Sequence, residues 1–148
     1  MPERYSGPSE YRLAGRLLCI WIANSAMPHG SWSIFREAWS DGYVVRRLII
    51  EGAAEQVYCD EAPIGKELVE SILASFEALQ VPAFRRPTRL GLDGGSQGIS
   101  LGDTWRSTTM EWWSGCEHEW EPLAEACSHA RWELEKMFAG NPRSGKYY

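Results

Sequence analysis

The sequence lacks the long hydrophobic run that a membrane-spanning helix requires. A span needs about 20 consecutive apolar residues, and the longest apolar-rich run, Leu17 to Ala23, is far shorter. Residues 1–10 contain two prolines and a glycine, but not the apolar core of a secretory signal. We therefore expect no membrane partner and a cytoplasmic location.

An excess of basic charge is also missing. The chain has 15 basic and 20 acidic residues, for a net charge of −5, and neither half is basic. Nucleic-acid-binding domains carry a basic patch or stripe, so we expect no nucleic-acid partner. The length of 148 residues, with 44% hydrophobic and 24% charged residues, is typical of one globular domain. We expect a single domain over 1–148, with flexible tails at 1–10 and 140–148.

Cysteine and histidine are few and are not spaced for a metal site. Four cysteines are scattered along the chain, and in a reducing compartment we expect free thiols. Cys116 with His118, and Cys127 with His129, supply ligand types that zinc prefers. On a helix, however, Cys127 and His129 would point about 200° apart. We expect no metal site, and no glycine-rich oxyanion loop accompanies either pair to suggest a Cys–His nucleophile.

The glycine-rich segment 91–95 does not have the features of a phosphate-binding loop. No Gly-Lys-Ser/Thr follows it, and no helix is predicted directly after the glycines. A turn between two strands explains these glycines better. We therefore expect no cofactor and no catalytic residues.

Alternating hydrophobicity predicts strands over most of the chain. Residues 13–22 fit both a helix and a strand, but the β-branched end and the turn residues after it favour a strand. Ser40-Asp41-Gly42 is a strong hairpin turn. The other predicted strands are Ser31–Trp39, Tyr43–Glu51, Glu55–Asp60, Arg89–Leu92, Gln97–Leu101 and Thr104–Trp113.

Two apolar stripes with spacings of three and four predict helices near 63–80 and 121–138. The stripes are Leu68, Val69, Ile72, Leu73, Phe76 and Leu79, and then Leu123, Cys127, Ala130, Leu134 and Met137. We expect Pro63 near the first turn of the first helix, and Asp60 either at its cap or as a carboxylate of its first turn. The element order predicts an α+β fold, with an antiparallel sheet of five or six strands and both helices packed on one face.

The eight tryptophans include several in an acidic stretch. Trp112 and Trp113 should point to opposite faces of a strand, so that one of them is core. Trp120 either packs onto the last helix or is exposed as an anchor for a partner or a sugar. The candidate partner-binding residues, here called the acidic patch, are Glu111, Glu117, Glu119, Trp120 and Glu121, with Asp103 and Trp105 across the adjoining turn.

An ordered series of short motifs gives the chain a family likeness. The series is Phe84 to Arg89, Gly91-Leu92-Asp93-Gly94, Ile99-Ser100-Leu101-Gly102, Glu111-Trp112-Trp113 and Trp120-Glu121-Pro122-Leu123. It resembles a pattern in small bacterial immunity-type proteins, which bind and block a cognate toxin. The pattern usually has a bulky residue after the Leu-Asp-Gly turn. Gln97 and Gly98 stand there in this chain, which predicts a looser strand.

The resemblance implies a toxin-binding protein with no catalytic apparatus. The rival hypotheses are a small ligand-binding or enzymatic domain with a Trp-lined cleft, and a scaffold module of a larger assembly. A deep pocket with a perturbed titratable group would favour an enzyme. A flat acidic surface with an exposed aromatic side chain would favour the toxin inhibitor.

Overall fold

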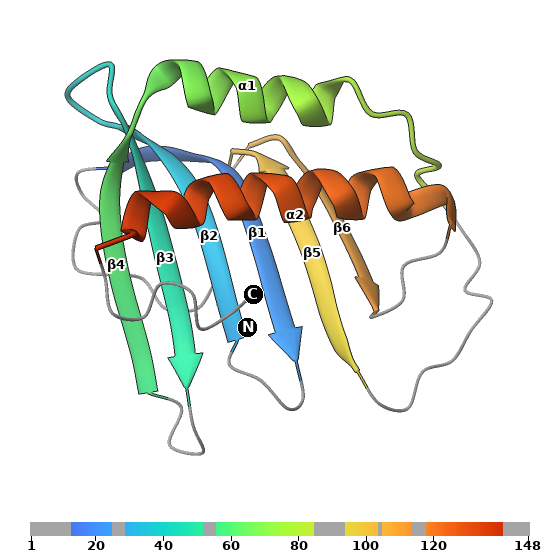
Figure 1. Cartoon of the computed structure of the whole chain (residues 1–148). Coiled ribbons are helices and arrows are strands. Elements are labelled where there is room, and N and C mark those ends of the chain that lie inside the picture. The colour runs from blue at the N-terminus through green and yellow to red at the C-terminus, as the bar shows by residue number, and fades with distance from the viewer. Residues whose placement is uncertain are drawn as a thin grey trace.

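Six antiparallel strands and two α-helices make up the described part of the chain (Figure 1). The structure is a computed structural model, and it describes residues 13–24, 29–51, 56–84, 94–103, 105–113 and 118–140. The elements are β1 (Leu13–Asn24), β2 (His29–Glu37), β3 (Tyr43–Glu51), β4 (Gln56–Ile64), α1 (Lys66–Glu77), β5 (Gly95–Gly102), β6 (Ser107–Trp113), η3 (His118–Trp120), α2 (Glu121–Glu135) and η4 (Lys136–Phe138). The predicted α+β fold is confirmed.

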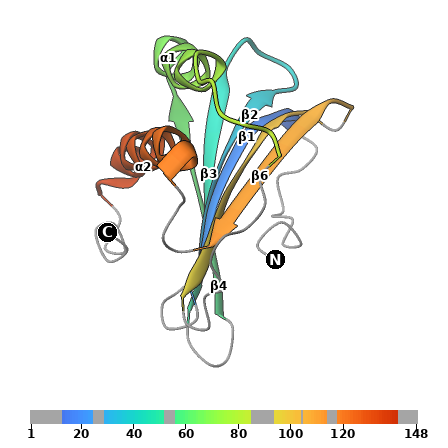
Figure 2. The ribbon, with the colours of Figure 1, turned by 90° about the vertical axis from the view of Figure 1, so that its right-hand side faces the viewer.

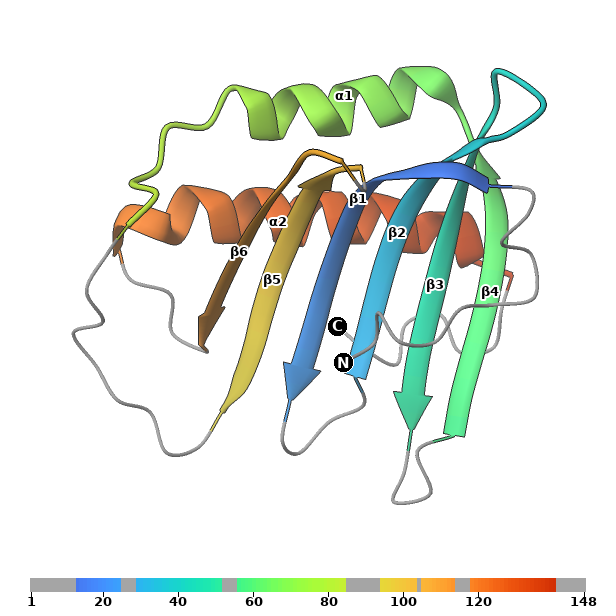
Figure 3. The same ribbon diagram turned by 180° about the vertical axis from the view of Figure 1, so that it is seen from behind.

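The strands form one sheet in the order β4-β3-β2-β1-β5-β6 (Figure 3). The first four strands are consecutive neighbours. After α1 the chain returns to the far side of β1, where β5 and then β6 complete the sheet. β1 is therefore an inner strand, and β4 and β6 form the two edges. One row across the sheet is Asp60, Arg47, Trp32, Ile20, Ile99 and Met110.

Both helices cover the same face of the sheet (Figure 2). The predicted stripes supply their buried sides, with Val69, Ile72 and Phe76 on α1, and Leu123, Cys127, Ala130 and Leu134 on α2. They pack against alternate strand residues that include Leu18, Ile34 and Ile49, each with no exposed surface. The prediction of two amphipathic helices on one face is thus confirmed, because burying both stripes on one sheet face removes them from water.

The start of α1 differs from the sequence prediction. β4 continues to Ile64, four residues beyond the predicted strand, and Gly65 occupies the helix cap. The expectation that Asp60 and Pro63 belong to the start of the helix is therefore wrong. Both residues belong to β4, where Asp60 binds Arg47 and an edge strand tolerates proline.

Two other strands are shorter than predicted. β2 ends at Glu37 rather than Trp39, and β6 begins at Ser107 because the preceding residues form the turn after β5. The predicted strand at 89–92 and the tails at 1–10 and 141–148 lie outside the described residues.

A buried ionic cluster joins α2 to the middle of the sheet. The Arg47 side chain has no exposed surface and binds Glu135 of α2, while its other terminal nitrogen lies 2.9 Å from Asp60 Oδ2. The indole N–H of Trp32 donates to the second oxygen of Glu135 over 2.7 Å. The Phe138 ring lies 4.5 Å from the guanidinium carbon. Each charge is thus paired and hydrogen-bonded, which is the condition for burying it.

We predict that Glu135→Ala lowers the free energy of unfolding by about 3–5 kcal/mol, because it leaves the Arg47 charge buried without its main partner. Glu133→Ala on the same helix is the matched control. Glu133 binds Lys136 near the surface, so its loss should cost at most about 1 kcal/mol. Chemical denaturation measures both, and equal losses would contradict the role given to the cluster.

Gly98 allows an indole ring to lie directly over β5. Gly98 is the cross-strand partner of Trp21. A Cβ at this position would approach Cζ2 of Trp21 to 2.2 Å, closer than atoms can pack. The strand that the sequence predicted to be loose is therefore closely covered, because the Trp21 ring occupies the space that a side chain would fill.

We predict that Gly98→Ala destabilises the chain by about 1–3 kcal/mol, the usual cost of overpacking. Gly15→Ala in β1 is the control, because a Cβ there meets nothing within 4 Å. In a Trp21→Val background the penalty of Gly98→Ala should shrink. Thermal unfolding of the four variants checks this, and an unchanged penalty without the indole would refute the steric explanation.

Candidate partner-binding surface

The described residues of the acidic patch lie on the side of the molecule where β6 forms the sheet edge. This side, with the β5–β6 turn, β6 and the start of α2, faces the viewer in Figure 2. The exposed side chains are Asp103, Trp105, Glu111, Glu119 and Glu121, and Glu117 lies outside the described residues. The β6 side carries carboxylates from three elements.

These residues do not form one flat face. Glu111 is the cross-strand partner of Gly98, so it points to the sheet face opposite the helices. Glu119 and Glu121 belong to η3 and α2, which lie on the helix-covered side. The acidic patch therefore wraps around the β6 edge.

The β5–β6 turn holds Trp105 out into solvent. Asp103 Oδ1 accepts the backbone N–H groups of Trp105 and Arg106, each over 2.8 Å. Gly102 has a φ of +107°, and a Cβ there would meet the Arg106 carbonyl oxygen at 2.0 Å, so the turn requires glycine. The Trp105 side chain is 91% exposed. A fixed backbone thus presents a large aromatic side chain that packs against almost nothing in the described part of the chain.

The same hydrogen bonds stabilise the ionised form of Asp103. The N–H of Arg106, and next that of Trp105, lower the pKa of the carboxyl below its ordinary value. Donors to a carboxylate favour its charged form. The turn therefore carries a negative charge beside the exposed indole across the physiological range.

Trp120 is engaged within the chain. Its ring is half-buried and packs against the core, and its Nε1 donates to the Pro82 carbonyl oxygen over 2.9 Å. This is the packing alternative that the sequence left open, and it fastens the start of α2 to the segment after α1. The exposed aromatic side chain of the acidic patch is therefore Trp105.

The tryptophan pair at the end of β6 follows the predicted division. Trp112 is 8% exposed and belongs to the core, whereas Trp113 is 47% exposed on the opposite face.

Near the start of α2, His118 Nδ1 lies 2.9 Å from Glu121 Oε2. This pair is exposed, so it contributes little to stability.

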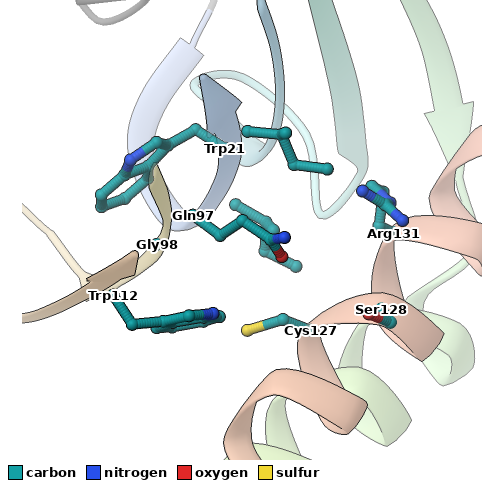
Figure 4. A pocket seen from close by; sticks show the side chains of 9 residues that line it. Trp21, Gln97, Gly98, Trp112, Cys127, Ser128 and Arg131 are labelled. Carbon is teal, nitrogen blue, oxygen red and sulfur yellow. The ribbon is translucent and has the colours of Figure 1, made fainter. Parts of the chain in front are cut away.

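A depression beside Trp112 is the place to look for a Trp-lined cleft (Figure 4). It encloses about 190 Å³ of space that includes open solvent, and no water molecule fits inside it. The nine lining residues are Ile20, Trp21, Ile22, Gln97, Gly98, Trp112, Cys127, Ser128 and Arg131. None of them is a carboxylate or a histidine, the usual groups for general acid–base chemistry.

The ligands considered for zinc point apart where the structure describes them. Cys127 is buried and His129 is exposed on α2, as the helical angle requires. Cys116 lies outside the described residues, as does most of the glycine-rich segment. Within the described ranges, His, Cys, Asp and Glu side chains do not gather in any group of three that would hold a metal ion.

A comparison of the sequence with protein-family models and with curated proteins finds no match. Neither described helix has the length and apolar character needed to cross a membrane. The likeness to immunity-type proteins therefore rests on the motifs of the sequence alone.

We predict that the backbone amides of Trp105 and Arg106 report the protonation of Asp103. Because the folded pKa is lower than that of the unfolded chain, the hydrogen bonds contribute stability above the unfolded pKa. This contribution is lost as the pH falls through the folded pKa. An NMR titration should place the amide transition below the ordinary range of aspartate. The Asp103→Asn variant keeps an oxygen acceptor but should show no transition, and a transition at the ordinary aspartate pKa would contradict the account.

Proposed function

We propose that this chain is an immunity-type protein that binds and neutralises a cognate bacterial toxin by direct protein–protein contact. The observation that carries the proposal is the exposure of Trp105 on a turn fixed by Asp103, beside an acidic edge. The motif series of the sequence supplies the expectation of a toxin partner. A binding protein of this kind works from the cytoplasm of the producing cell and needs no cofactor.

The geometry supports protein binding because the backbone that carries the Trp105 anchor is already held in place. A tryptophan that enters a partner's pocket is a frequent hot spot of binding energy. The two hydrogen bonds to Asp103 fix the turn before association, so less conformational freedom is lost on binding. Association with a positively charged partner face would be faster because Glu111, Glu119 and Glu121 give the β6 side an excess of carboxylates.

Trp39 is a useful contrast because it is also 88% exposed. It lies in the β2–β3 turn, where Arg36 pairs with Asp41 at 3.5 Å. The Trp105 turn also holds both signs of charge, Asp103 and the exposed Arg106, but the β6 side adds Glu111, Glu119 and Glu121. Electrostatic attraction of a basic partner therefore favours the Trp105 side. A contact centred on the β2–β3 hairpin remains the alternative outcome of the experiments below.

The partner can be identified by affinity purification from the native host. The purified partner is then expressed in cells with and without this chain. We expect growth inhibition by the partner alone and rescue by co-expression. A partner that is harmless to cells, or a toxin that still kills in the presence of this chain, would contradict the proposed function.

We predict that Trp105→Ala weakens binding to the toxin by at least about 2 kcal/mol, whereas the matched Trp39→Ala changes it by less than about 0.5 kcal/mol. Glu111→Lys combined with Glu119→Lys should slow association, and added salt should slow the wild type in the same way. Surface plasmon resonance measures both rates. The reverse order of the two tryptophan variants would move the interface to the β2–β3 hairpin.

A further inference from the structure

The outer edge of β6 is open along the described part of the chain. β6 is the last strand of the sheet, and among the described residues only β5 pairs with it. Its side chains are exposed at Ser107, Thr108, Thr109, Glu111 and Trp113, on both faces of the strand. Such an edge presents a row of backbone N–H and C=O groups that another strand can join.

The other edge of the sheet is protected in ways that β6 is not. β4 contains Asp60, Glu61 and Pro63, and η4 packs against it. Inward charge, proline and a covering element are the usual devices that prevent strand addition. β6 contains no proline, lysine or arginine, and its threonines and tryptophans favour extended structure.

We propose that β6 binds an extended, positively charged segment of the partner as a seventh strand of the sheet. This inference rests on the proposed function, because it names how the toxin is held. Backbone hydrogen bonds along the edge would supply affinity, and the side chains of β6 would select the sequence of the incoming strand.

Charge decides between a basic segment and a second copy of this chain. Two β6 strands paired antiparallel about Met110 would place each Glu111 diagonally opposite the other, about 7–8 Å away on one face. A segment that carries lysine or arginine turns the repulsion between these carboxylates into attraction.

The two faces of β6 also define the pattern of the incoming strand. Thr109, Glu111 and Trp113 point to one face, and Thr108, Met110 and Trp112 point to the other. Cationic residues would lie beside Glu111, where Trp113 adds a ring for cation–π contact. Apolar residues would lie on the face of Met110. The matching segment therefore alternates basic and apolar residues.

The test uses the full chain, ¹⁵N-labelled, and a seven-residue acetylated and amidated peptide that alternates lysine and valine, matching the length of β6. NMR measures amide shifts and hydrogen exchange during titration. At about 1 mM peptide, we expect outward-pointing amides of β6 to exchange at least about tenfold more slowly. A glutamate–valine peptide should bind at least about tenfold more weakly.

A proline pair provides the matched control. Successive N–H groups of an antiparallel strand point to opposite sides, so one of Thr108→Pro and Thr109→Pro blocks the outer edge and the other breaks the β5 ladder. The variant that keeps the wild-type melting temperature is the edge block, and it should lose peptide binding.

In the peptide experiment, three results would overturn the inference. They are no slowing of amide exchange in β6, equal binding of the two peptides, and binding that survives the edge block. Toxin neutralisation that survives the edge block would also overturn it while leaving the proposed function intact. If the peptide binds at β6 but no toxin partner is found, the proposed toxin-neutralising function is contradicted and strand addition at β6 is not.

Discussion

The buried ion pair between Arg47 and Glu135 determines how the two layers of this protein fit together. Arg47 lies in the third strand, inside a sheet face that is otherwise largely apolar, and the last turn of α2 offers it the buried carboxylate of Glu135. Trp32 donates to the same carboxylate, and Asp60 completes the charge balance from the edge strand. Since an unpaired buried charge is strongly unfavourable, α2 cannot slide or rotate on the sheet without losing several interactions at once.

The fixed position of α2 has a consequence at its other end. The helix begins next to Trp120, whose indole N–H reaches the Pro82 carbonyl after α1. The start of α2 is therefore fastened to the segment that follows α1. The β6 side carries two exposed indoles, those of Trp105 and Trp113, and several carboxylates, with Trp105 on the turn that Asp103 closes.

Much of the fold could be predicted because burial leaves a periodic signal. The stripes of both helices and the alternating strands follow directly from the need to bury apolar side chains on one side of each element. The start of α1 was misplaced because Asp60 has two possible uses. A carboxylate shortly before a helix is typical of an N-terminal cap. In this chain Asp60 instead forms an ion pair with Arg47 of β3, which lies far from α1 in the sequence.

The candidate surface was predicted only in part. The location of the carboxylates was apparent from the absence of lysine and arginine over 111–125. The sequence could not decide whether Trp120 or Trp105 is the exposed ring, because that depends on the Pro82 carbonyl, far away in the chain. Arg47 and Glu135 were missed for the same reason. The sequence pattern does not show that a charged residue is buried, because its burial depends on an oppositely charged partner from another element.

The most direct test of the account is amide hydrogen–deuterium exchange of this chain alone and in complex with its toxin. We expect exchange to slow on binding in residues 103–113 and 118–121, with little change in the β2–β3 turn. Slowing confined to residues 38–42, or to the face of α2 near Trp132, would contradict a partner-binding surface on the β6 side.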